Sequence, residues 1–130
     1  MGTVVERIEK NMNNLIELLN KIDFNVLDID KLLDGRESNV FDTEWIRVYK
    51  TVELLKNEEN YSTAEKNSNS TIREIVFKKI YELSNDGDLA GYVSDDFGLI
   101  ADAELLGYKD EWLDKLISCY ENKTIPSGRI

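Results

Sequence analysis

The fold class follows from the stretch Phe97-Gly98-Leu99-Ile100-Ala101-Asp102-Ala103-Glu104-Leu105-Leu106, which lies in the last third of the chain. Its apolar residues are spread so evenly that a helix formed by it would be apolar nearly all round. Such a helix has no broad polar side to offer to water, and it belongs in the middle of a bundle of other helices. Gly107 follows directly and is suited to end the helix. We therefore expect residues 97–106 to form a central helix.

The segments on either side have the periodicity of amphipathic helices. Their apolar residues recur at steps of three and four, which is the spacing of one helix face. Thr3 is expected to cap the first helix and Asp110 the last. One proline and no run of alternating apolar and polar residues argue against a sheet. The sequence predicts one all-α domain of five to seven helices over residues 1–130, with the outer helices near 3–22, 26–35, 43–56, 71–84 and 110–125.

Three local patterns refine this expectation. Residues 57–70 carry almost nothing to bury and are typical of a mobile loop. Ser94-Asp95-Asp96 has the form of a helix cap with an acidic first turn, preceded by a short helix that starts at Leu89. Several aromatic side chains fall on or beside the apolar stripes and are expected to face inward: Trp45, Tyr49, Phe77, Tyr81 and Trp112.

Composition excludes several classes of function. The 130 residues include 16 Lys and Arg against 26 Asp and Glu, for a formal charge of −10. A direct nucleic-acid binder needs a basic face toward the phosphates, so we exclude that class. The absence of histidine excludes Ser-His-Asp and Cys-His catalysis, and Cys119 has no second cysteine to pair with. No apolar run approaches the roughly 20 residues of a membrane span, and no signal pattern marks the N-terminus, so we expect a cytoplasmic protein.

The sequence contains no complete motif for metal binding or for catalysis. Asp28-Ile29-Asp30 and Asp86-Gly87-Asp88 begin like calcium loops, which need a carboxylate at position 12. That position holds Asn39 in the first stretch and an aromatic residue in the second. Neighbouring carboxylates diverge by about 100° on a helix, so Asp95 and Asp96 cannot flank one bond. We expect no cofactor, no metal and no enzyme, with a hydrolase whose carboxylates meet only through the fold as an open alternative.

Most of the negative charge lies in residues 86–114. This segment has nine acidic residues and one basic residue, a net of −8, while the other 101 residues hold 17 acids and 15 bases. Helix starts explain part of this, since a carboxylate there gains about 0.3–1 kcal/mol from the helix dipole, and a simply solvated surface stays open. A clustered negative field also speeds the capture of a cationic partner. We expect a partner-binding face with two tyrosine anchors, made of Tyr92, Asp95, Asp96, Asp102, Glu104, Tyr108, Asp110 and Glu111.

One C-terminal stretch is similar to a known group of proteins. It runs Asp88-Leu89-Ala90-Gly91-Tyr92-Val93-Ser94-Asp95-Asp96-Phe97-Gly98-Leu99-Ile100-Ala101-Asp102-Ala103 and continues through Tyr108 and Glu111-Trp112-Leu113 to Ile125-Pro126. It resembles the small immunity proteins that bacteria encode beside polymorphic toxins, including those of contact-dependent growth inhibition.

The resemblance implies a cytosolic, non-enzymatic protein that binds its cognate toxin domain, often a nuclease, and blocks it. A nuclease holds phosphates with a basic site, so an acidic helical surface can occupy that site or bind beside it. The partner is then a basic toxin domain, with no direct contact to nucleic acid or membrane. The alternative is a helical scaffold or adaptor without a toxin partner.

Overall fold

The computed structural model describes residues 3–130, which form six α-helices, one 3-10 helix and no strand. The helices are α1 (Val4–Leu19), α2 (Ile29–Arg36), α3 (Asn39–Glu58), α4 (Thr63–Ser84), α5 (Gly87–Leu106) and α6 (Glu111–Glu121), and the 3-10 helix η1 is Phe24–Val26. The predicted all-α class is confirmed. The expectation for the N-terminus includes residues 1 and 2, which lie outside the described residues.

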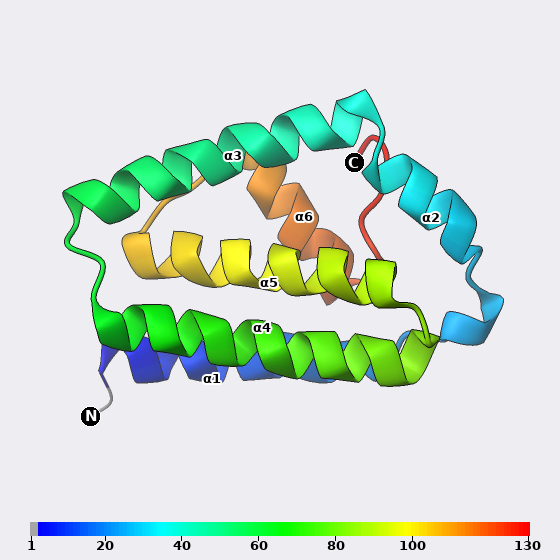
Figure 1. Ribbon diagram of the computed structural model, residues 1–130, viewed down its shortest axis with the longest axis horizontal. Coiled ribbons are helices and arrows are strands. Elements are labelled where there is room, and N and C mark those ends of the chain that lie inside the picture. Colours follow the sequence, from blue (N-terminus) through cyan, green and yellow to red (C-terminus); the bar gives the residue numbers. More distant parts are fainter. Residues whose placement is uncertain (1–2) are drawn as a thin grey trace.

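Helix α5 lies in the middle of the bundle (Figure 1). It contacts α1, α2, α3 and α4, and 12 of its 20 residues are buried. Helix α4 runs beside it on one side, α3 crosses on the other side, and α1 and α6 lie behind in the view of Figure 1. The central position that the sequence predicts for residues 97–106 is therefore confirmed.

The ends of three helices are the predicted ones. The Thr3 hydroxyl accepts a hydrogen bond from a backbone amide at 3.0 Å and begins α1. The Asp110 carboxylate does the same at 2.9 Å and begins α6. Gly107 adopts a φ of 68° and ends α5. Helix α3 begins earlier than expected because Ser38, and not a residue near position 43, accepts the capping hydrogen bond.

The expected loop over residues 57–70 is for the most part helical. Only residues 59–62 connect α3 to α4. Ser62 caps α4 by accepting a backbone hydrogen bond at 3.1 Å, and the Asn69 amide donates to the Gly98 carbonyl at 2.9 Å. Polar residues suffice here, because this part of α4 is held to α5 by Asn69 and to α1 by a hydrogen bond from Ser68 to Glu9 at 2.9 Å, and most of its other side chains are exposed.

Ser94-Asp95-Asp96 does not begin a helix, because α5 is continuous through it. Asp86 provides the cap of α5. The Ser94 hydroxyl instead donates to the Arg73 carbonyl on α4 at 2.8 Å, and the Asp96 side chain points into the core. The same residue types serve at helix starts and as buried polar contacts, so the local pattern led to the wrong boundary.

Three of the aromatic side chains that the periodicity places inside lie at the surface. Tyr49, Phe77 and Tyr81 are 44%, 40% and 47% exposed, whereas Trp112 is buried and Trp45 is half-buried. The buried residues of these two helices are Phe41, Val48 and Val52 on α3 and Ile72, Val76 and Ile80 on α4.

Candidate partner-binding face

Asp96 is fully buried in the middle of α5 and is bound by the protein itself. Both of its oxygens accept from the Arg36 guanidinium at 2.6 Å. The Trp45 indole and the Tyr120 hydroxyl donate to the same carboxylate at 2.9 and 2.5 Å. Asp96 therefore ties α5 to α2, α3 and α6. The sequence pattern suggested that Asp96 lies on an exposed face. In the structure its carboxylate is buried, and donors from the protein itself supply its hydrogen bonds.

Asp102 is also buried, about 1.7 turns further along α5. It forms an ion pair with Lys56 at 2.7 Å and accepts a hydrogen bond from the Tyr61 hydroxyl at 2.5 Å. Burial and this hydrogen bond raise the pKa of Tyr61 far above its ordinary value, so the hydroxyl stays a donor. Burial alone would lower the pKa of Lys56, but its hydrogen bonds to Asp102 and Glu53 raise it overall. This cluster fastens α3 to α5.

Asp95 is about half exposed, the Asp110 side chain is only 11% exposed, and each has an arginine partner. Asp95 pairs with Arg73 on α4 at 2.8 Å, and both side chains are about half exposed. Asp110 accepts from Arg47 on α3 at 2.8 and 3.1 Å, and this contact lowers the pKa of Asp110. The pair of Asp95 with Arg73 is therefore neutral, whereas Arg47 also pairs with Glu44, so the cluster around Arg47 keeps one net negative charge.

The other candidate residues do not join one surface. Glu111 is exposed at the start of α6, and the Tyr108 hydroxyl donates to Asp110 at 3.4 Å. Glu104 is half-buried, and burial raises its pKa although the nearby charges of Lys109 and Arg7 act against this. Of the eight predicted residues, three line connected cavities on one face: Tyr92, Asp95 and Asp102.

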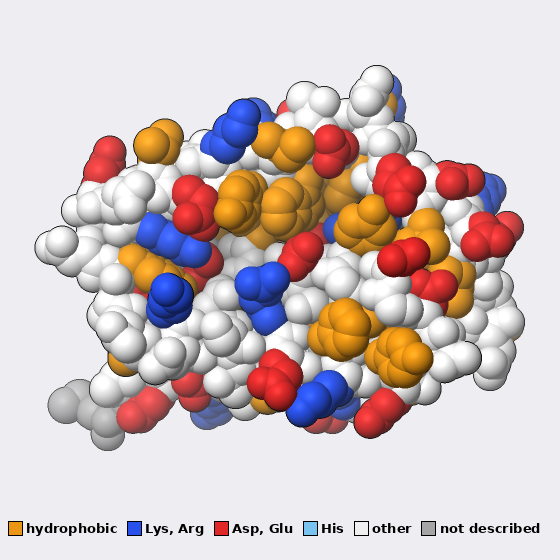
Figure 2. Space-filling model, viewed as in Figure 1, with side chains coloured by type: hydrophobic (Ala, Val, Ile, Leu, Met, Phe, Trp, Pro, Cys, Tyr) orange, Lys and Arg blue, Asp and Glu red, His pale blue; other side chains and the backbone are white. Residues whose placement is uncertain are grey.

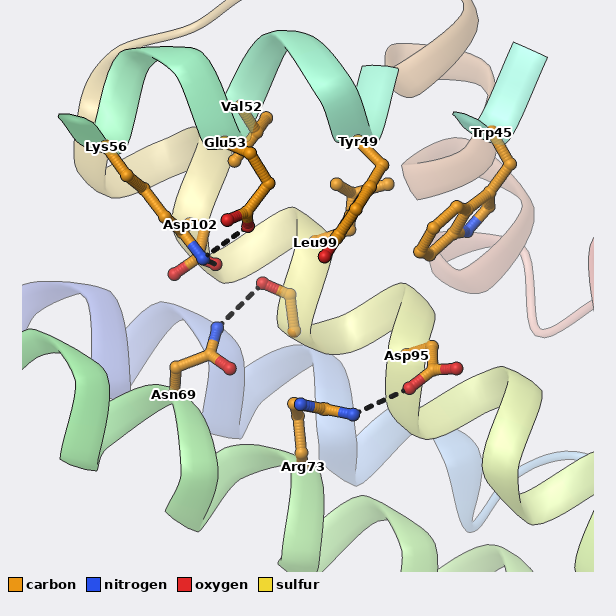
Figure 3. A pocket seen from close by; sticks show the side chains of 11 residues that line it. Trp45, Tyr49, Val52, Glu53, Lys56, Asn69, Arg73, Asp95, Leu99 and Asp102 are labelled. Atoms are coloured by element: carbon orange, nitrogen blue, oxygen red, sulfur yellow. Dashed lines mark hydrogen bonds and ion pairs between the residues drawn. The ribbon is translucent and has the colours of Figure 1, made fainter. Parts of the chain in front are cut away.

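The larger cavity forms a groove between α3 and α4, with α5 as its floor (Figure 3), and the smaller cavity continues it between α3 and α5. The main part has a volume of about 420 Å³ and includes Trp45, Tyr49, Arg73, Leu99 and Asp102 in its walls and floor. A smaller cavity of about 190 Å³ shares Trp45 with it and extends to Tyr92. We call this side of the molecule, formed by α3, α5 and α4, the groove face.

Two stacked aromatic pairs flank the groove. Trp45 and Tyr49 on α3 have ring centroids 5.4 Å apart, and Phe77 and Tyr81 on α4 have centroids 6.4 Å apart. Figure 2 shows hydrophobic side chains gathered over both helices on either side of the hollow. Exposed aromatic side chains of this kind supply much of the binding energy at protein interfaces. The sequence signal for the aromatic pair on α4 is the position of Phe77 and Tyr81, which lie directly beside the stripe of buried aliphatic residues.

Three further carboxylates lie around Tyr92, at one end of the groove face. The Tyr92 hydroxyl donates to Glu37 at 3.0 Å, and Asp42 lines the cavity beside Tyr92. Burial, the Glu37 contact and the charge of Asp88 raise the pKa of Tyr92. Among residues 3–130, no Lys or Arg lies within ion-pair distance of these three carboxylates. Figure 2 shows acidic side chains gathered at this end.

Membrane-spanning helices and metal-binding groups are both absent from the described residues. No helix within it combines the length and apolar character that crossing a bilayer requires. It also contains no group of three or more acidic or cysteine side chains arranged around a possible metal ion. Burial raises the pKa of Cys119, which disfavours the reactive thiolate.

A groove that combines exposed aromatic rings with carboxylates is suited to contact with another protein. A family model described as Immunity protein PIM1 matches residues 7–127, which include the greater part of α1 and all of α2 to α6. The chain belongs to this family, which supports a toxin-neutralising function and confirms the resemblance found in the C-terminal stretch. Comparison with curated proteins gave no match.

Proposed function

We propose that this protein neutralises one cognate toxin domain by binding it directly, as a non-enzymatic one-to-one inhibitor. The observation that carries the proposal is the family match over residues 7–127. Because the match covers nearly the whole folded body, inhibition would be a property of the bundle and not of an appended segment.

The partner in this proposal is a basic domain, and a nuclease fits best. The net charge of −10 would steer a basic toxin toward the protein and raise the association rate by roughly 10–10³-fold at low salt. A nuclease needs basic groups to hold phosphates, so an acidic protein can cover the active site or bind next to it. Binding of this kind requires no contact between the inhibitor and nucleic acid.

The exposed acids and the tyrosines in residues 86–114 remain proposed contacts. We expect Tyr92, Asp95, Asp110 and Glu111 to reach the toxin directly, and Glu104 and Tyr108 to contribute at the edge. The two buried acids would act indirectly. Asp96 holds Trp45 in place, and Asp102 holds Lys56 and Tyr61 in place.

Co-expression with the product of the neighbouring gene tests the function. We expect growth to be rescued and the two chains to purify as an equimolar complex. A toxin that still kills in the presence of the folded protein would contradict the proposal. A complex whose association rate does not change with salt would contradict the basic partner, since steering by charge weakens as salt screens it.

A further inference from the structure

We propose that the toxin docks on the groove face, with an arginine or lysine side chain entering the smaller cavity beside Tyr92. This inference rests on the proposed function, because it names the surface and the chemistry of the toxin segment that binds there. It adds to the contacts proposed from residues 86–114 a defined site that includes residues of α2 and α3.

Several exposed apolar side chains lie on this face. Ile46 and Tyr49 on α3 and Phe77 and Tyr81 on α4 are all more than a third exposed. Interfaces commonly combine such anchors at the centre with a polar rim. Here the anchors flank a groove whose polar groups are mostly paired with each other, as in the contacts of Arg73 with Asp95 and of Lys56 with Asp102.

The smaller cavity has the size of one long side chain. Its volume of about 190 Å³ corresponds to roughly six waters at ~30 Å³ each, too little for a whole helix. The aromatic residues Phe41, Trp45 and Tyr92 line it, together with the carboxylates of Asp42 and Asp95. Aromatic rings beside carboxylates are suited to a cation, because ring faces attract a positive charge and carboxylates accept its hydrogen bonds.

The charge of this cavity is suited to a cationic guest. Arg36 also lines it and already lies 4.2 Å from the centroid of Phe41 and 5.2 Å from that of Tyr92. The charge of Arg36 is matched by the buried Asp96. The carboxylates of Glu37 and Asp42 have no such partner among residues 3–130, so the surroundings of the cavity are negative.

The cavity is also held in shape before the toxin arrives. The hydrogen bond from the Trp45 indole to Asp96 fixes the ring between the two parts of the groove. The hydrogen bond from Tyr92 to Glu37 fixes the phenol ring of Tyr92, which lies on α5. Side chains that are already ordered lose less conformational entropy on binding, which favours affinity.

The steric test fills the cavity and measures affinity for the co-purified toxin domain. Ile46 lines the cavity, so Ile46→Trp would block it. The matched control is Leu54→Trp on the same helix, since Leu54 is exposed and lines none of the cavities of the groove face. We expect Ile46→Trp to weaken binding about tenfold or more, the scale of a hot-spot contact, and Leu54→Trp to leave it unchanged.

The charge test neutralises the cavity without changing its shape. The variant combines Glu37→Gln with Asp42→Asn, and its control combines Glu6→Gln with Glu17→Gln, two exposed positions on α1 that line none of the cavities of the groove face. A cationic guest predicts weaker binding and a flatter salt dependence only for the first variant. An apolar guest predicts that the first variant binds as tightly as the unmodified protein or more tightly, and this result would overturn the inference. Circular dichroism and thermal unfolding show whether each variant is folded.

The two proposals fail in different ways. If the unmodified protein does not bind or inhibit the toxin, the proposed function is wrong. If it inhibits the toxin but folded Ile46→Trp binds normally, the docking site is wrong and the proposed function stands.

Discussion

Arg36 and Asp96 form a bidentate ion pair in the centre of the protein, with both nitrogen–oxygen distances at 2.6 Å. The two residues are 60 positions apart, and their contact joins the end of α2 to the middle of α5. Burial alone would lower the pKa of Arg36, but Asp96 raises it overall, so the guanidinium is charged at neutral pH. A buried pair gains little net free energy, since both charges lose their water. We infer that its main effect is to fix α2 against α5 and to orient Trp45 beside the groove.

Removing one charge of this pair should be costly. Asp96→Asn leaves the buried Arg36 without a counter-charge, and we expect a loss of about 3–5 kcal/mol in the free energy of unfolding. Urea denaturation measures this loss. The control is Asp95→Asn at the neighbouring position, where the exposed pair with Arg73 is worth about 0–1 kcal/mol. Equal effects of the two variants would contradict the buried network.

The start of α4 can be tested at two serines. Ser62 accepts the capping hydrogen bond of α4, so Ser62→Ala should cost about 1 kcal/mol of stability. Ser70→Ala should have little effect, because Ser70 lies inside the helix and is exposed. Thermal unfolding of both variants is the measurement. A larger loss of stability at Ser70 would contradict this helix start and would favour the loop over residues 57–70 that the polar sequence suggested.

Two glycines of α5 should respond in opposite ways to alanine. A Cβ at Gly98 would lie 2.7 Å from Cδ of Arg73, so Arg73 would have to move away from its place across α5. A Cβ at Gly91 would meet no atom within 4 Å. We expect Gly91→Ala to stabilise the protein by about 0.5–1 kcal/mol through helix propensity and Gly98→Ala to lose that gain or destabilise. Urea denaturation of both variants checks this, and an equal gain at both sites would contradict the close approach of α4 and α5.

The contact between Arg47 and Asp110 should make stability depend on pH. The hydrogen bonds from Arg47 lower the pKa of Asp110 in the folded state. A lowered pKa stabilises the fold above the ordinary Asp pKa, and this contribution is lost as the pH falls through the folded value. Asp110→Asn keeps a good capping residue but removes the charge.

We therefore expect the free energy of unfolding of the unmodified protein to exceed that of Asp110→Asn by about 0.2–1 kcal/mol near pH 7. This is the range for an ion pair in contact with solvent. The difference should shrink as the pH falls below the ordinary Asp pKa. Urea denaturation at several pH values measures it. A difference that stays constant down to acid pH would show that the charge of Asp110 is not responsible.

Local features of the sequence were sufficient for the fold class. The even distribution of apolar residues in 97–106 predicted a central helix, and Thr3, Gly107 and Asp110 predicted three helix ends. These signals depend on neighbours within one or two turns, which a single sequence contains in full.

The features that failed depend on distant partners. Nothing near Asp96 in the sequence indicates Arg36, which is 60 residues away, so the carboxylate was expected at the surface. Periodicity also cannot separate a core aromatic residue from one at the edge of a buried stripe, which is the position of Tyr49 and Tyr81. The acids left unpaired at the groove, Glu37 and Asp42, precede the charged segment that the count of acidic residues identified.

Titration of the purified toxin domain with the purified protein shows directly whether the protein inhibits the toxin as a one-to-one complex. The account predicts that toxin activity falls in proportion to the added protein and is abolished at one equivalent. Toxin that keeps its full activity in the presence of several equivalents of folded protein would contradict the account.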